Sequence, residues 1–379
     1  MNAIPAVDFA PALRLLALAT LLAALPLAWW WWRHRHAGPR GRLVALSALA
    51  LFLTADLIVF GSFTRLTDSG LGCPDWPGCY GAASPMGASA HIQAAEVAQP
   101  EGPVTVTKAW IEMIHRYLAM MVGALIIVLT IALWRTPAMV GHTLRWAFAA
   151  LVWVVIQGLF GKYTVTLKLY PAVVTAHLLG GLILLGLLVA QFETLRQARS
   201  IAGRRWLGWA LALVTAQIAL GGWVSTNYAV LACRGFPQCN GQWWPPMDFA
   251  QGFVLLRELG RGAGSAYLDF PALVAIHMAH RLFAIVVLLA ISALVVRLWR
   301  RGQVDARRHA TVLCLLLLVQ LVSGLSNVVL DWPMVAALMH TAGAAGLVGV
   351  LVSMWMRSQV QPAAADTHSS DPALERGVA

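Results

Sequence analysis

The sequence carries little charge for its length. Only 11% of its 379 residues are Asp, Glu, Lys or Arg, whereas a soluble domain carries about 25%. Hydrophobic residues make up 59% of the chain, and several apolar runs exceed the roughly 20 residues that cross a bilayer. This composition excludes a soluble globular protein. It predicts an all-α polytopic membrane protein, because backbone groups in lipid must be hydrogen-bonded within helices.

Acidic residues are especially scarce, at 16 against 27 Lys and Arg, which gives a net charge of +11. Such an excess is found in nucleic-acid-binding proteins, but here the basic residues lie between apolar runs, as the positive-inside rule expects. We therefore expect no nucleic acid partner. The runs predict nine membrane spans, at residues 12–32, 43–64, 110–134, 146–163, 172–191, 207–228, 271–296, 310–330 and 334–356.

The basic residues also predict the orientation of the chain. Most of them fall in one alternate set of loops, at 33–42, 135–145, 196–205 and 297–308, and in the tail. These segments are expected to be cytoplasmic, with the N-terminus outside. Residues 1–32 could be read as a signal peptide, but the run is long and ends in tryptophans at 29–32, typical of an interfacial belt, with no small-residue cleavage site after them. The polar tail from Gln361 is expected to be disordered.

Cysteines are few, and four of the five form two short-range pairs, Cys73 with Cys79 and Cys233 with Cys239. The second pair follows the first by 160 residues. Four histidines in apolar stretches recur in the same way. His280 follows His115 by 165 residues and His340 follows His177 by 163.

These recurrences indicate an internal duplication, which further motifs support. IEMIHR at 111–116 matches IHMAHR at 276–281, and glycines follow both His177 and His340. Each repeat then has four helices, and an even number places both repeats in one orientation, with both cysteine pairs outside, where disulfides persist. We expect two pseudo-symmetric four-helix bundles with this organisation: 1–42, an extra transmembrane helix and cytoplasmic loop; 43–196, the N-terminal bundle; 197–357, the C-terminal bundle; 358–379, a cytoplasmic tail.

The four histidines favour two bis-histidine haem sites. A lone histidine in a span is often only a hydrogen-bonding group between helices, but four at matched depth, paired by duplication, are better explained as ligands. Imidazole suits zinc and copper as well, yet zinc takes three or four ligands and each repeat supplies two. Haem iron needs only two, because the porphyrin supplies the others. Glycines 180, 181, 343 and 346 either give room for the macrocycle or are ordinary close packing.

Glu112 is the other residue that points to chemistry. It precedes His115 by three residues, so both share a helix face, and a carboxylate beside a bound haem could accept protons. The alternative is a structural pairing with Arg116 or Lys108. The corresponding residue of the second repeat is His277, expected to pack rather than to bind metal, so that half would only carry electrons. Structural disulfides are the favoured explanation for Cys233 and Cys239, whereas for Cys73 and Cys79 a functional role is equally open.

Taken together, these motifs resemble the haem A synthase family from about residue 43 to 356. The resemblance is carried by TRLTDSGLGCPDWPGC at 64–79, EMIHR at 112–116, His280-Arg281, and the helices of His177 and His340. The family oxidises the C8 methyl of haem O to a formyl group by successive hydroxylations, in the bacterial inner membrane. The extra first helix departs from its eight-helix core.

The resemblance implies a role for each motif. It assigns His280 and His340 to a haem b cofactor and His115 and His177 to the substrate haem, with their irons as the metals bound. It assigns Glu112 a catalytic role and makes Cys73–Cys79 a functional disulfide. It implies haem O and membrane lipid as partners, and raises a haem O synthase, an electron-transfer partner and a homo-oligomer. A two-haem cytochrome b relay and a haem or proton-coupled transporter are the competing interpretations.

Overall fold

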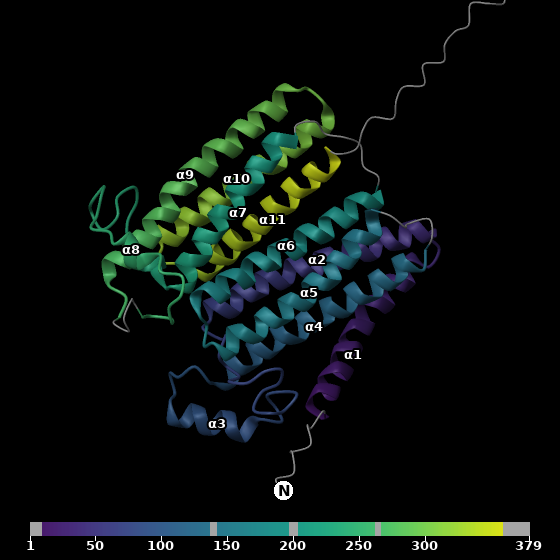
Figure 1. The fold of residues 1–379 in the computed structure, drawn as a ribbon, viewed down its shortest axis with the longest axis horizontal. Helices are drawn as coiled ribbons and strands as arrows, with labels where there is room; N and C mark the ends of the chain where they lie inside the picture. Colours follow the sequence, from purple (N-terminus) through teal and green to yellow (C-terminus); the bar gives the residue numbers. More distant parts are fainter. Residues whose placement is uncertain (1–9, 137–141, 197–203, 262–266, 359–379) are drawn as a thin grey trace, which may run out of the picture.

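The structure is a computed structural model, and it describes residues 10–136, 142–196, 204–261 and 267–358. These residues form helices joined by loops (Figure 1). The α-helices are α1 (Ala10–His34), α2 (Pro39–Leu66), α3 (Ser89–Ala98), α4 (Val106–Trp134), α5 (His142–Thr166), α6 (Pro171–Arg196), α7 (Arg204–Thr226), α8 (Phe249–Gly252), α9 (Phe270–Arg300), α10 (Val304–Val329) and α11 (Met334–Arg357), and Ala229–Leu231 form the 3₁₀ turn η2.

Nine helices within the described residues are long and apolar enough to cross a membrane, and each overlaps one predicted span. The prediction of a multi-pass helical membrane protein is therefore confirmed. The ends differ by a few residues. The helix α4 begins earlier than predicted because Thr105 caps it, its side chain accepting a hydrogen bond from the backbone N–H of Lys108. The predicted disordered tail lies outside the described residues from 359 onward.

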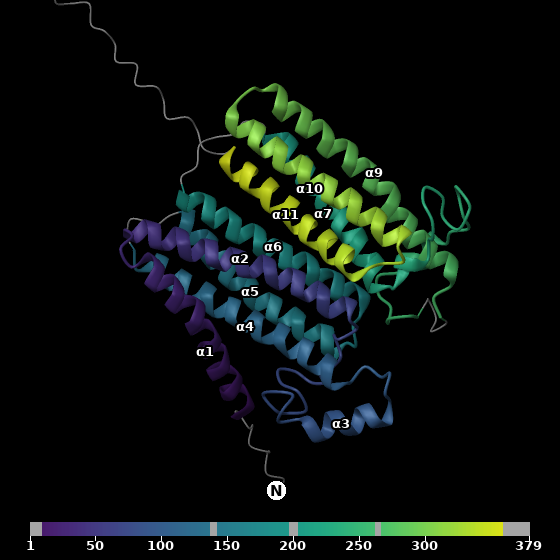
Figure 2. The same cartoon turned by 180° about the vertical axis from the view of Figure 1, so that it is seen from behind.

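The long helices gather in two groups (Figures 1 and 2). The helices α2, α4, α5 and α6 pack together, and α7, α9, α10 and α11 pack beside them. The extra helix α1 lies on the flank of α4 and α2. Contacts between the groups are made by α2 and α6 with α7 and α11. The short helices α3 and α8 lie at the same end of the long ones (Figure 1), which is also the end where α4, α6, α9 and α11 begin.

The backbone repeats its unusual features at the spacing of the duplication. Positive φ angles occur at Asp68 and Tyr228, and at Tyr80 and Asn240, which are each 160 residues apart. The turn before α6 has them at 168–169 and the turn before α11 at 331–332, an offset of 163. Cis peptide bonds precede Pro77 and Pro237. Since positive φ is uncommon outside glycine, its recurrence indicates that the two halves turn their chain alike.

Polar contacts join the two groups of helices at the C-terminal ends of α2 and α7. The guanidinium of Arg65 donates to the carbonyl of Ser225 at 2.6 Å and lies 3.9 Å from the ring centroid of Tyr228. The Tyr228 hydroxyl donates to Asp68 at 2.6 Å. Burial raises the pKa of Tyr228, more than the neighbouring Arg65 lowers it. The hydroxyl therefore stays protonated and keeps its donor role at neutral pH.

Candidate functional site

The four predicted ligands lie in the first three turns of four separate helices. His115 is on α4, His177 on α6, His280 on α9 and His340 on α11. All four side chains are partly buried. The His280 and His340 rings have their centroids 6.5 Å apart with an interplanar angle of 74°. His115 and His177 lie close enough for a charge on one ring to act on the other. The structure thus brings together one histidine pair in each group of helices.

A glycine of a neighbouring helix lies against each histidine ring. A Cβ placed on Gly61 would be 3.0 Å from Nε2 of His115, and one on Gly221 would be 2.9 Å from Cε1 of His280. The other two histidines have the same arrangement. An added Cβ would lie 3.7 Å from Cε1 of His177 on Gly161, and 3.3 Å from Cε1 of His340 on Gly324. The pairs recur at the spacing of the duplication. These glycines let the ring approach the neighbouring backbone, which most larger side chains would prevent.

The glycines that the sequence suggested for a macrocycle lie elsewhere. A Cβ on Gly180 would be 1.9 Å from the amide of Gln157, and one on Gly343 would be 2.4 Å from the amide of Gln320. One on Gly346 would meet Leu316 at 2.9 Å, and one on Gly181 would meet Ile58 at 3.6 Å. All four thus face side chains of neighbouring helices, which favours close packing among the two interpretations that the sequence left open.

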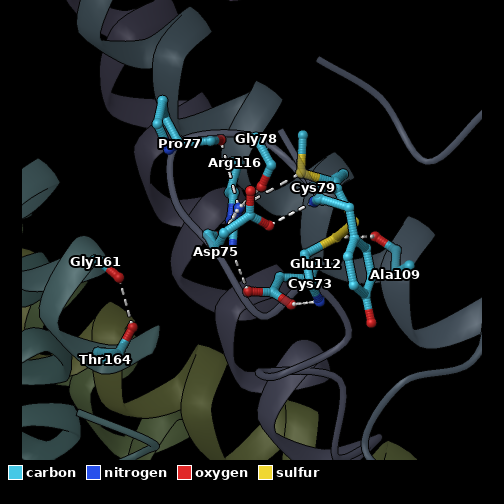
Figure 3. A network of polar contacts seen from close by, with 12 residues as sticks. Cys73, Asp75, Pro77, Gly78, Cys79, Ala109, Glu112, Arg116, Gly161 and Thr164 are labelled. Atoms are coloured by element: carbon cyan, nitrogen blue, oxygen red, sulfur yellow. Dashed lines mark hydrogen bonds and ion pairs between the residues drawn. A yellow bond between two sulfur atoms is a disulfide. The ribbon is translucent and has the colours of Figure 1, made fainter. Parts of the chain in front are cut away.

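Glu112 is buried, with 4% of its surface exposed, and both of its oxygens are engaged (Figure 3). Oε1 accepts a hydrogen bond from Nη2 of Arg116 at 2.5 Å, and Oε2 accepts one from the backbone N–H of Cys73 at 2.8 Å. Lys108 instead donates to the carbonyl of Gly102. The structural pairing with Arg116 is therefore present, and the carboxylate links α4 to the cysteine loop.

Arg116 holds the same loop from its other nitrogen (Figure 3). Its Nη1 donates to the carbonyls of Asp75, at 2.9 Å, of Pro77 and of Gly78. The loop closes on a buried disulfide between Cys73 and Cys79. The ion pair whose two residues flank His115 on α4 thus holds the loop.

The second half has a matching loop without a carboxylate. A buried disulfide joins Cys233 to Cys239, and Arg281 donates to the carbonyls of Cys233, at 2.5 Å, and Gly235, at 3.1 Å. His277, at the place of Glu112, is buried and its Nδ1 lies 3.0 Å from the carbonyl of Ala229. Its position agrees with the packing role expected from the sequence.

The donor set fits haem better than a metal ion bound by protein alone. Within the part of the chain that the structure describes, no three His, Cys, Asp or Glu side chains gather as metal ligands. Each half offers two imidazoles from two helices, and zinc sites ordinarily take at least three protein ligands. A group that brings its own four equatorial nitrogens and takes two axial imidazoles matches this set.

The two histidine pairs differ in their polar neighbours. This difference was not predicted from the sequence. The amide of Gln217 lies 3.0 Å from Nδ1 of His280, and the hydroxyl of Ser323 lies 3.0 Å from Nδ1 of His340. In the first half, Nδ1 of His177 is buried without a hydrogen-bond partner among the described residues. His115 stacks against Phe60, with ring centroids 6.3 Å apart.

Fold and site together define a multi-pass helical membrane protein with a histidine pair in each of two helix groups. The chain belongs to the COX15-CtaA family, described as cytochrome oxidase assembly protein, whose model matches residues 44–352. This match begins in α2 and leaves out α1, so the first helix lies outside the region that the family shares.

Relatives of known name extend the match over most of the chain. A haem A synthase of Shewanella oneidensis is 36% identical over 328 residues, covering 84% of this chain and 98% of its own. One of Caulobacter vibrioides is 30% identical over 346 residues, covering 82% and 95%. One of Halalkalibacterium halodurans is 27% identical over 296 residues, covering 75% and 86%. The resemblance expected from the motifs is confirmed.

Proposed function

We propose that this protein is a haem A synthase, a membrane oxidoreductase that converts the C8 methyl of haem O to a formyl group by successive hydroxylations. Family membership and the similarity to haem A synthases support the activity. The observation in the structure that carries it is the difference between the halves. Both have a histidine pair, but among the described residues only the first has a buried carboxylate within one turn of a ligand, Glu112 on the helix of His115.

The proposal gives each histidine pair its own haem. His280 and His340 hold a haem b, which supplies a one-electron carrier when bound. His115 and His177 would hold the substrate among α2, α4, α5 and α6, whose packed interior further along the helices is apolar. Each imidazole binds iron through one nitrogen and so must keep the proton on the other.

Glu112 is the residue proposed to handle protons. Oxidising a methyl group releases protons, and an acceptor within the site assists their departure. Glu112 lies three residues from His115 and carries a charge-assisted hydrogen bond from Arg116. This bond holds the carboxylate in place, and the Cys73–Cys79 loop covers it. The disulfide acts by fixing this cover, in keeping with the functional role that the resemblance implies.

The architecture supports two pseudo-symmetric four-helix bundles, at 43–196 and 197–357, with α1 as an addition. The recurring backbone turns and histidine–glycine pairs favour this arrangement. The distribution of basic residues favours an inner membrane orientation with periplasmic cysteine loops and a cytoplasmic C-terminus. A haem O synthase that delivers substrate, an electron acceptor and a second copy of the chain are the partners that this function would require or accommodate.

A cytochrome b that only relays electrons is the second candidate, favoured by the similar histidine pairs in both halves. Pigment analysis of the purified protein separates the two functions. The synthase should contain haem b together with variable amounts of haem O or haem A. Two equivalents of haem b and no other haem would establish the relay and overturn the proposed synthase.

A further inference from the structure

The contacts of Ser323 favour a proton on Nδ1 of His340. Ser323 Oγ donates to the carbonyl of Val319 at 2.5 Å and lies 3.0 Å from Nδ1 of His340. A hydroxyl has a single proton to donate. With that proton directed to Val319, Ser323 accepts from Nδ1–H of His340. The lone pair of Nε2 is then free for iron, as in ligand histidines whose other nitrogen is hydrogen-bonded.

The first half has Phe160 where the second has Ser323. Three independent pairs fix this correspondence at an offset of 163 residues: His177 with His340, Gly161 with Gly324, and Gln157 with Gln320. Phe160 offers no acceptor, and Nδ1 of His177 is accordingly buried without a partner in the described part of the chain. The ring of His177 is therefore less constrained in tautomer and orientation than that of His340.

The backbone of His340 also has a hydrogen bond that the backbone of His177 lacks among the described residues. The amide of Gln320 donates to the carbonyl of His340 at 2.8 Å. The amide nitrogen of Gln157, its counterpart, is buried without a hydrogen-bond partner among the described residues. Both the ring and the peptide of His340 are thus tied to α10, whereas neither contact holds His177 to α5.

The other histidine of each pair follows the same pattern. Gln217 on α7 donates to the carbonyl of His280 at 3.1 Å and lies beside its ring. Gly61 and Gly221 set the offset of α2 and α7 at 160 residues, which places Leu57 at the position of Gln217. Within the described residues, the ring of His115 stacks against Phe60 and makes no side-chain hydrogen bond of the kind that Gln217 offers His280. Among the described residues, polar contacts of this kind hold the histidines of the second half and not those of the first.

We propose that Ser323 is a positioning residue that makes haem binding by His340 permanent, and that Phe160 keeps the first site exchangeable. This inference rests on the proposed function, in which one haem stays as cofactor while the other enters as substrate and leaves as product. Removing a hydrogen bond behind a ligand histidine commonly weakens metal binding by about 10–100-fold. A site that must release its product gains from lacking such a bond.

The test measures haem loss from the intact protein in detergent, with excess apomyoglobin as the acceptor. The variants are Ser323→Ala, Ser323→Thr, Phe160→Ser and His340→Ala. Ser323→Ala should release haem b about 10–100-fold faster and should raise its reduction potential, because the imidazole becomes a poorer electron donor. Ser323→Thr keeps the hydroxyl and should restore both values. Phe160→Ser, loaded with haem O, should release that haem more slowly than the wild type.

Each outcome has a distinct meaning. An unchanged rate of haem b loss in Ser323→Ala, or an unchanged potential, would overturn the positioning role. Failure of Ser323→Thr to restore the wild-type values would do the same. Haem O loss from Phe160→Ser at the wild-type rate would overturn the claim for the first site. If His340→Ala itself retained haem b, the proposed ligand assignment would fail first, independently of Ser323.

Discussion

Glu112 and Arg116 form an ion pair one helical turn apart, with Oε1 2.5 Å from Nη2. The second oxygen of Glu112 accepts a hydrogen bond from the backbone N–H of Cys73. The carboxylate therefore binds the disulfide loop, and it lies on α4 three residues before His115. A substitution that removes both the loop contact and the carboxylate cannot tell the structural role from the proton-accepting role. The replacement must therefore keep the shape of the side chain.

Glu112→Gln should abolish most haem A formation while leaving haem b in place. Glutamine keeps the shape and can still accept the Cys73 N–H, but it cannot take up a proton. General base catalysis is typically worth about 10²–10⁴ in rate, so extracted haem A should fall by that order. Haem A at the wild-type level would show that Glu112 is structural and that the proton acceptor lies elsewhere.

Glu193→Gln is the matched control for that experiment. Glu193 is also a buried carboxylate in a span, with 8% of its surface exposed, and it accepts a hydrogen bond from Ser353 at 2.6 Å. It lies on the last turn of α6, far along the helix from His177. Its replacement should leave haem A formation near the wild-type level. A loss as large as that of Glu112→Gln would mean that any lost buried carboxylate disables the protein.

Cys73 and Cys79 should resist thiol labelling until a reductant is added. Both are buried and joined to each other, and Cys233 and Cys239 are joined likewise. The positive control is the same sample after reduction and denaturation, in which all four thiols become free to react with a membrane-permeant maleimide. Mass spectrometry of unreduced protein should find no label on Cys73, Cys79, Cys233 or Cys239. Ready labelling of Cys73 and Cys79 would contradict the disulfide or the outside location of its loop.

Gly221→Ala should disturb haem b, because the new methyl group would lie 2.9 Å from Cε1 of His280. The axial ligand must tilt or withdraw, and haem b content and its low-spin spectrum should change. Gly208→Ala on the same helix has nothing within 4 Å of the added methyl. It should leave the spectrum unchanged, since alanine within a helix is otherwise favoured over glycine. Equal spectra for both variants would contradict the contact between Gly221 and His280.

A reporter fused after residue 358 should behave as cytoplasmic, and one inserted at 99–102 as periplasmic. The basic loops on the side of the C-terminus predict this orientation. Alkaline phosphatase activity, which needs the periplasm, should appear with the second fusion and not with the first. The reverse pattern would invert the topology and place both disulfide loops in the cytoplasm.

The sequence was sufficient for the nine spans, because hydropathy encodes them directly. The duplication and the ligand roles of the four histidines stay predictions from spacing. The sequence also raised the pairing of Glu112 with Arg116 as an alternative, since residues four apart on a helix meet. Short helices in the loops were harder to predict than the spans. The helix α3 lies in a polar loop and has no long apolar run, so it was not predicted.

The neighbours of the histidines could not be derived from the sequence in the same way. Which glycine faces a ring depends on how two helices pack, so Gly180 and Gly343 were chosen for their closeness in sequence, whereas Gly161 and Gly324 make the contact. Ser323 was missed for the same reason. An alignment of the repeats at an offset of 163 would have placed it opposite Phe160 and signalled a difference between the halves.

The central claim is the oxidation of haem O by this chain, and the most direct test is haem extraction from a host that makes haem O but no haem A. Expression of the wild-type protein should produce haem A, identified by chromatography and mass, at the expense of haem O. A host with the full-length protein folded and loaded with haem b, yet containing haem O and no haem A, would contradict the account.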